Sequence, residues 1–106
     1  MIDRKPRPRR SPKWAALAKR FLRANSCCAV CGRSENVVAH HICPFHLFPS
    51  MELDEANLIP LCEGRTVNCH LAVGHLFLWA SYNPAVVLDA AAITQKVKMR
   101  PGVAKI

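Results

Sequence analysis

Two segments of the chain carry apolar residues at helical spacing. The first predicts a helix over 12–24, with Ser11 as N-cap, Pro12 at the first helical position, and an apolar stripe of Trp14, Leu17, Ala18, Phe21 and Leu22. The second predicts a helix over 84–98, which begins at the pair Asn83 and Pro84 and stops before Pro101 and Gly102. The apolar stripe of this C-terminal helix favours packing on the core.

Two shorter segments have the composition of strands. NVVAHHI at 36–42 is rich in β-branched residues and precedes Pro44, while NLIPLC at 57–62 contains Pro60 and so suits an edge strand. A loop should join them over 45–56, and a third helix should begin at 68 or 69, with a glycine interrupting it. The expected fold class is therefore α+β, with two strands and a short helix between flanking N- and C-terminal helices.

The chain is short and basic. Its 106 residues allow one domain, and its net charge is +8, with nine of the fifteen Lys and Arg residues lying between Arg4 and Arg23. We expect a basic flexible arm at 1–11 and a single domain at 12–106, whose core spans about 26–80. Such an arm suits a polyanion, and nucleic acid is the usual one. A solvated tail that only aids solubility is the alternative reading.

The chain contains six cysteines. Cys28 and Cys31 form a CxxC pair followed by Gly32, the spacing of a zinc knuckle, and Cys62 and Cys69 supply a second pair some thirty residues later. Four thiolates in a closed tetrahedral site suit a structural Zn²⁺. The interval of six residues in the second pair is wider than usual. Cys27 could replace Cys28 by a shift of register, Cys43 fits a buried or semi-exposed thiol, and free thiols or a redox CxxC are weaker alternatives.

The hydropathy pattern favours a cytoplasmic protein. The charged N-terminal ten residues lack the apolar stretch that a signal peptide needs, and the longest apolar run, at 71–80, is broken by Gly74 and His75 and is too short to span a membrane. Thiols in the cytoplasm stay reduced, so metal binding is favoured over disulfides.

Two adjacent histidines, His40 and His41, occupy the first predicted strand. Neighbouring residues of a strand point to opposite faces, so both rings cannot ligate one ion unless the backbone twists. One ring can bind a metal while the other acts on a nearby water. Hydrolysis of a phosphodiester needs this division, with a cation beside the phosphate and a base that takes a proton from water.

The chain resembles the HNH endonucleases, whose core is the ββα-metal fold. The resemblance covers about residues 26–80 and is carried, in the family's order, by the segments CAVCG, VVAHHICPFH, ELDEANLIPLC and NCHLAVGH. The basic helix before CxxCG is also similar to that family's usual lead-in.

The resemblance assigns roles to individual residues. It implies that His41 is the general base, that His40 and His70 bind the catalytic divalent cation, and that Asn57 braces the loop between the strands. It also implies that Cys28, Cys31, Cys62 and Cys69 hold the structural zinc. The catalytic residues by this resemblance are His41, Asn57 and His70.

Two features depart from the common family pattern. His40 stands where aspartate is frequent, so Zn²⁺, Ni²⁺, Co²⁺ or Mn²⁺ becomes as plausible as Mg²⁺. His75 follows His70 by five residues and would be a third ligand, although i, i+5 is off the best spacing on an α-helix. His46, in the loop after Pro44, fits either a contact with DNA or an exposed loop histidine.

The resemblance implies hydrolysis of DNA to 5′-phosphate and 3′-hydroxyl ends, with the short helix across the minor groove and weak sequence preference. The basic residues expected to bind flanking phosphates are Arg7, Arg9, Arg10, Lys13, Arg20 and Arg23. A zinc-stabilised nucleic-acid-binding module without catalysis is the alternative, and it leaves His41 unexplained. Nicking or double-strand cleavage, the oligomeric state, and a phage-encoded or restriction-like origin are left open by the sequence.

Overall fold

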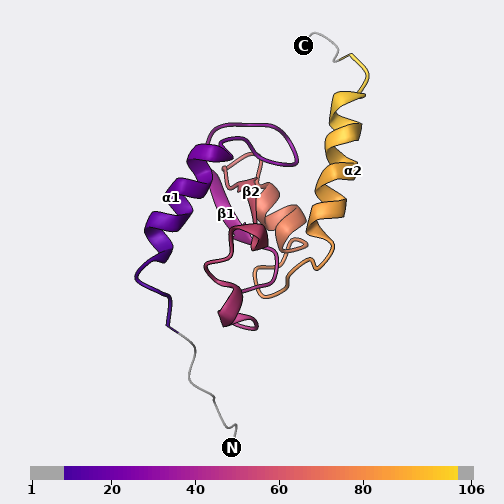
Figure 1. Ribbon diagram of the computed structural model, residues 1–106. Coiled ribbons are helices and arrows are strands. Elements are labelled where there is room, and N and C mark those ends of the chain that lie inside the picture. The colour runs from indigo at the N-terminus through magenta and orange to yellow at the C-terminus, as the bar shows by residue number, and fades with distance from the viewer. Residues whose placement is uncertain (1–8, 103–106) are drawn as a thin grey trace, which may run out of the picture.

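The structure is a computed structural model in which residues 9–102 are described (Figure 1). The elements in chain order are α1 (Trp14–Ala24), β1 (Val37–His41), η1 (Pro49–Met51), η2 (Glu55–Asn57), β2 (Leu58–Cys62), η3 (His70–Gly74) and α2 (Val86–Lys98). The expected small α+β fold is confirmed, with two antiparallel strands, flanking helices and a four-cysteine cluster.

The sheet is a single antiparallel pair. His40 lies opposite Ile59, His41 lies opposite Leu58, and Pro60 sits within β2. The Pro60 carbonyl accepts a hydrogen bond from the Ala29 backbone N–H at 2.8 Å, on the side away from β1. Because the N–H and C=O of one strand residue point to the same side, the proline removes no hydrogen bond between β1 and β2.

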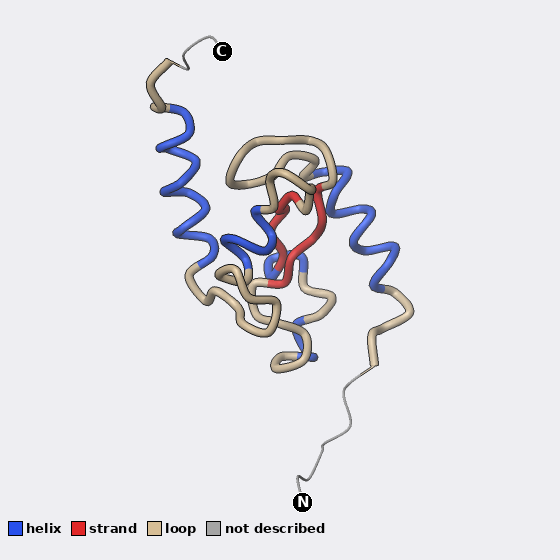
Figure 2. Tube along the Cα trace, turned by 180° about the vertical axis from the view of Figure 1, so that it is seen from behind, coloured by secondary structure: helices blue, strands red, loops and turns tan. Residues whose placement is uncertain are grey.

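The two long helices lie on opposite sides of the sheet (Figures 1 and 2). Leu17 and Phe21 are the buried residues of α1, which contacts β1. On the other side α2 contacts η3 and places Val86 and Ala90 in a core centred on the fully buried Leu61. The apolar stripe of the C-terminal helix therefore packs on the core, as expected. Within residues 9–102, every helix is too short or too polar to cross a membrane.

Both long helices begin two residues after the predicted start. The Ser11 side chain accepts a hydrogen bond from the Lys13 N–H at 3.1 Å, and so closes a turn before α1 rather than capping it. Asn83 likewise accepts from the Ala85 N–H at 2.9 Å, ahead of α2. Short Ser and Asn side chains form hydrogen bonds with nearby backbone groups both in helix caps and in turns, so the sequence alone does not distinguish a cap from a turn.

The largest local difference from the expected fold is η3. The predicted third helix is a single turn of π-helix, His70–Gly74. Leu76 and Phe77, which follow it, have left-handed φ values of 51° and 67°. The Phe77 N–H bonds to the Leu71 carbonyl at 2.8 Å and closes this turn. π-turns of this kind are rare, and they occur often at functional sites.

Candidate metal centres and the adjoining cleft

The first cysteine pair forms the expected knuckle. Gly32 has a φ of 80°, a conformation that a residue with a Cβ adopts at a cost, and its N–H bonds to the Cys28 carbonyl at 3.0 Å. The Val30 N–H points at the Cys28 sulfur, at 3.4 Å. The turn thus directs both sulfurs of Cys28 and Cys31 to one side.

The second pair completes a four-cysteine cluster. The sulfurs of Cys28, Cys31, Cys62 and Cys69 all lie within 4.8 Å of one another. The Cys31 and Cys62 sulfurs are 3.7 Å apart, far longer than a disulfide bond of about 2.05 Å. Metal–sulfur bonds of about 2.3 Å place two sulfurs of a tetrahedral site about 3.8 Å apart. The cluster is therefore compatible with a structural zinc; Cys27 is exposed and Cys43 lies outside the cluster.

Gly64 explains the wide spacing of the second pair. Its N–H bonds to the Val67 carbonyl at 3.0 Å, and a Cβ at this position would lie only 2.9 Å from that oxygen. This tight turn folds the six intervening residues back, so that Cys62 and Cys69 meet.

The electrostatics of the cluster also suit a cation. Burial raises the pKa of the Cys28 thiol, but hydrogen bonds from the backbone of Cys31, Val30 and Cys62 outweigh it and lower that pKa to about 7. Burial raises the pKa of Cys31 and of Cys69. Packed thiols resist ionisation together without a positive charge, and a divalent metal supplies that charge.

Three histidines form a second cluster. His40 comes from β1, and His70 and His75 come from the start of η3 and the residue after it; one nitrogen from each lies within 4.8 Å of the others. The Nε2 atoms of His70 and His75 are 3.3 Å apart. Tetrahedral coordination with metal–nitrogen bonds of about 2.0–2.1 Å requires about the same separation. The residues present therefore fit a divalent cation.

The π-turn is what brings His75 to His70. An α-helix aligns residues four apart, whereas a π-helix bonds each residue to the fifth one along. A spacing of five, which is unfavourable for shared coordination on an α-helix, therefore places the two rings side by side here, with centroids 4.8 Å apart.

A hydrogen bond orients the His75 ring, and burial keeps the His40 ring neutral. His75 Nδ1 lies 2.7 Å from the Ser81 carbonyl, which can only accept, so the proton is on Nδ1 and the lone pair is on Nε2. His40 Nε2 is buried without a hydrogen-bond partner in the described part of the chain. Burial, and secondarily the other histidines, lowers the pKa of His40 to about 3. The His40 ring is thus neutral, the form that binds metals.

Glu63 stands behind His70. Its Oε1 lies 3.7 Å from His70 Nδ1, the ring nitrogen that does not face His75. That distance is too long for a hydrogen bond, and His70 Nδ1 has no hydrogen-bond partner among the described residues. Burial lowers the pKa of His70, and Glu63 partly offsets that effect. A carboxylate behind a metal-binding imidazole is a common supporting arrangement.

Gly74 is a site residue that the sequence reading missed. It is buried, and a Cβ added there would lie 3.0 Å from Leu61 Cδ1 and 3.1 Å from His40 Cε1. Without a side chain at this position, η3 approaches β1 closely enough for its histidines to meet His40. The interruption of the apolar run by glycine was the only signal of this contact.

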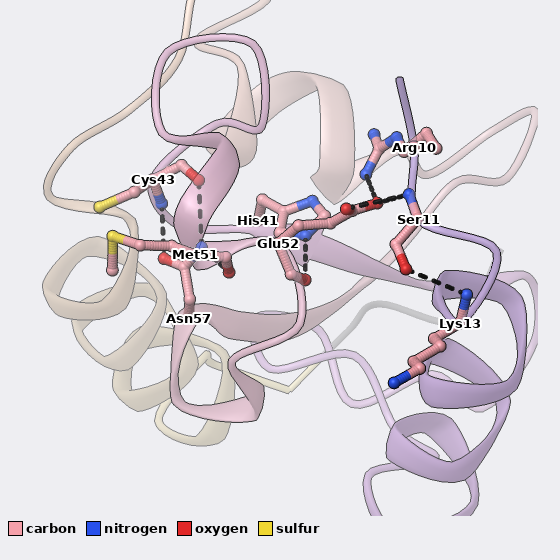
Figure 3. A network of polar contacts seen from close by, with 8 residues as sticks. All are labelled: Arg10, Ser11, Lys13, His41, Cys43, Met51, Glu52 and Asn57. Atoms are coloured by element: carbon pink, nitrogen blue, oxygen red, sulfur yellow. Dashed lines mark hydrogen bonds and ion pairs between the residues drawn. The ribbon is translucent and has the colours of Figure 1, made fainter. Parts of the chain in front are cut away.

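His41 points away from the three-histidine cluster but borders the same cleft. Its Nε2 lies 2.9 Å from the Glu52 carbonyl oxygen (Figure 3), so Nε2 carries the proton and Nδ1 keeps a lone pair. The Trp14 indole stacks on the ring, with centroids 4.5 Å apart. Burial lowers the pKa of His41, and the Glu52 backbone bond partly offsets it. The ring is therefore neutral at pH 7 and oriented.

Asn57 holds the loop that carries Glu52. Its side-chain oxygen accepts from the Cys43 N–H at 2.8 Å, and its amide group donates to the carbonyls of Cys43 and Met51 at 3.1 and 3.2 Å (Figure 3). Asn57 is buried, and its side chain ties together the two ends of the loop between β1 and β2. It braces His41 indirectly, by fixing the loop whose carbonyl orients the ring.

Glu52 was also missed as a site residue. Its carboxylate is buried, accepts the Ser11 N–H with both oxygens at 3.1 Å, and lies 3.9 Å from Arg10 (Figure 3). An acidic residue in an acidic loop gives no sequence signal of burial. The end of the predicted basic arm is thereby anchored beside His41.

The other basic residues are placed less specifically. Arg9, Lys13 and Arg23 are exposed, and Arg20 pairs with Glu55 at 3.1 Å. Arg7 and the rest of segment 1–8 lie outside the described residues. Arg10 stands out because its guanidinium lies over the Phe45 ring, 4.5 Å from the centroid, at the cleft.

A cleft of about 300 Å³ joins these groups. His41 and the three clustered histidines line it, together with Arg10 and exposed His46; aromatic rings from Trp14, Phe45, Trp79 and Tyr82 complete the wall. No Asp or Glu side chain of the described residues lines this cleft. The arrangement places a neutral, oriented imidazole, a histidine cluster that fits a cation, and a basic rim in one space.

Comparisons with the models of known protein families, with curated proteins and with solved structures found no match for this chain.

Proposed function

We propose that the protein is a metal-dependent endonuclease of the HNH type that hydrolyses DNA phosphodiester bonds. One observation carries the proposal: His41, with its proton held on Nε2 by the Glu52 carbonyl, borders the same cleft as the histidine cluster of His40, His70 and His75. A base and a cation site in one cleft are the two groups that hydrolysis by an activated water requires.

His41 is the general base of the proposed mechanism. Its Nδ1 lone pair accepts a proton from a water aligned with the scissile P–O bond, while the Nε2 bond to Glu52 keeps the ring from turning. The three clustered histidines would hold a divalent cation, which would supply positive charge for the phosphate and the departing 3′-oxygen. Arg10 adds a positive charge at the same cleft. The products would carry 5′-phosphate and 3′-hydroxyl ends.

The ligand set informs the choice of catalytic ion. Three imidazoles, without a carboxylate lining the described cleft, favour borderline ions such as Zn²⁺, Ni²⁺ or Co²⁺ over Mg²⁺ and Mn²⁺, which prefer oxygen ligands. The four-cysteine cluster would hold a separate Zn²⁺ whose role is to stabilise the fold.

DNA binding is proposed from charge. The net charge is +8. Arg9 and Lys13 are exposed and lie just before α1, on either side of Arg10 in the sequence. Each phosphate contact made by such residues should add about 0.9 to the slope of log affinity against log salt. The alternative, a zinc-stabilised nucleic-acid-binding module, accounts for the cysteines and this charge but gives no role to the oriented His41.

Relaxation of supercoiled plasmid with added Mn²⁺, Ni²⁺, Co²⁺, Zn²⁺ or Mg²⁺ separates the two functions. The proposed nuclease relaxes or linearises the plasmid, and His41→Ala abolishes cleavage while both metal sites and DNA affinity persist. Leu88→Ala, at an exposed position of α2, is the control and should cleave normally. Binding without cleavage for every ion would leave the binding module, and a fully active His41→Ala variant would remove His41 from the role of base.

A further inference from the structure

The segment that follows His75 exposes four large apolar side chains in succession. The exposed fractions are 51% for Leu76, 78% for Phe77, 62% for Leu78 and 50% for Trp79. Leu76 and Phe77 also adopt left-handed backbone conformations, which non-glycine residues take at a cost. A fold that holds apolar side chains in water on a strained turn gains no stability from them, and such a patch commonly marks a binding surface.

This segment is continuous with the cleft. The Trp79 ring lines the cleft, and its centroid lies 5.1 Å from that of His70 and 4.9 Å from that of His75. Trp14 covers His41 on the same cleft. One indole therefore lies beside the three-histidine cluster and the other beside His41. Phe77 precedes Trp79 by two residues in the same exposed segment.

We propose that Phe77 and Trp79 form a stacking platform for unpaired DNA bases next to the scissile phosphate, so that single-stranded or locally unpaired DNA is the preferred substrate. This inference rests on the proposed nuclease function and names its substrate class. Bases in a duplex hide their faces against their neighbours, whereas unpaired bases expose them and stack on aromatic side chains irrespective of sequence.

Charge favours nucleic acid over other occupants of the patch. A second copy of the chain would also carry a charge of +8, so two copies would repel each other. A single DNA strand can satisfy both features at once. Its phosphates would pair with Arg10, and its base faces would stack on Phe77 and Trp79. The patch and the cleft would then be filled by one ligand.

The test uses the full chain with His41→Ala as a background that does not cleave, and it measures binding of a labelled twelve-nucleotide strand and of its duplex by fluorescence anisotropy. The strand should bind more tightly than the duplex. Phe77→Asn and Trp79→Leu should each weaken strand binding about tenfold or more, with a much smaller effect on the duplex. Trp79→Phe keeps a ring and should retain most of the affinity.

The variants are chosen so that folding does not decide the result. Asparagine tolerates the left-handed conformation of position 77, so Phe77→Asn should fold at least as well as the parent. Leu88→Ala is the matched control, because Leu88 is 75% exposed on α2, close to the 78% of Phe77. Its strand affinity should equal that of the parent.

Equal affinity for strand and duplex, or strand binding unchanged by both Phe77→Asn and Trp79→Leu, would overturn the platform. A dimer seen by analytical ultracentrifugation that Phe77→Asn dissociates would also overturn it, in favour of a second copy. Failure of the proposed function looks different: the protein with an intact His41 would cleave neither strand nor duplex with any ion, whatever the binding ratio.

Discussion

The indole of Trp14 shields one face of His41, with the two rings inclined by 28°. Trp14 opens α1, so the N-terminal helix covers the proposed base as well as packing on the sheet. Trp14 therefore both belongs to the fold and helps to bury His41, and this burial sets the pH range in which His41 can accept a proton.

We expect the acid limb of the cleavage–pH profile to have its midpoint below 6.5. Burial lowers the pKa of His41, and a nearby cation would lower it further, so the neutral base persists as the pH falls below 6.5. Trp14→Ala exposes the ring and should move the midpoint to higher pH, whereas Trp14→Phe should move it little. A midpoint that stays in place in Trp14→Ala would show that the limb belongs to another group.

Gly74→Ala should weaken the histidine site selectively. The added methyl group meets Leu61 and His40 at 3.0–3.1 Å, and overpacking of this kind costs about 1–3 kcal/mol. We expect Co²⁺ affinity at the histidines to fall about tenfold, while the metal content of the cysteine site is unchanged. Gly102→Ala is the control, since a Cβ there meets no described atom within 4 Å. Equal Co²⁺ affinities in the two variants would contradict the close packing inferred for η3.

Glu52→Ala should lower both stability and activity. It leaves the partly buried Ser11 N–H without its acceptor, which costs about 1–3 kcal/mol of unfolding free energy, and it frees Arg10 from the cleft rim. Urea denaturation of the zinc-loaded protein measures the first effect, and kcat with unchanged metal content measures the second. Glu55→Ala removes only the exposed pair with Arg20, so it should cost about 0–1 kcal/mol. A Glu52→Ala variant as stable as Glu55→Ala would contradict this account.

Loss of the cysteine metal should abolish the histidine site, but the reverse should not hold. Cys69 immediately precedes His70, and Cys62 immediately precedes Glu63, so the four-cysteine cluster fixes both the start of η3 and the carboxylate behind it. We expect Cys69→Ser to lose the metal at both sites, and His40→Ala to keep one tightly bound metal and the native circular dichroism. Elemental analysis of both variants checks this, and a Cys69→Ser protein that keeps its histidine metal would show the two sites to be independent.

The sequence predicted those features that follow from spacing and alternation. The pair Cys28 and Cys31 at knuckle spacing met the more widely spaced pair Cys62 and Cys69 in one cluster, and strand alternation separated His40 from His41. It did not predict the π-turn, because helical propensity does not distinguish an α-turn from a π-turn when tertiary packing decides. The burial of Glu52 also had no sequence signal, since its partner is the backbone N–H of Ser11, which any residue except proline would provide.

The proposed site depends on the register in which β1 pairs with β2. Shifting β1 by one residue along β2 would place Ala39 or Ile42 on one of the two faces that now present imidazoles, so one of the two roles would lose its side chain. The Ile42 N–H, bonded to the Asn57 carbonyl at 2.8 Å just beyond the ladder, resists such a slip. A single-residue insertion in this five-residue strand should therefore be far more damaging to catalysis than to folding.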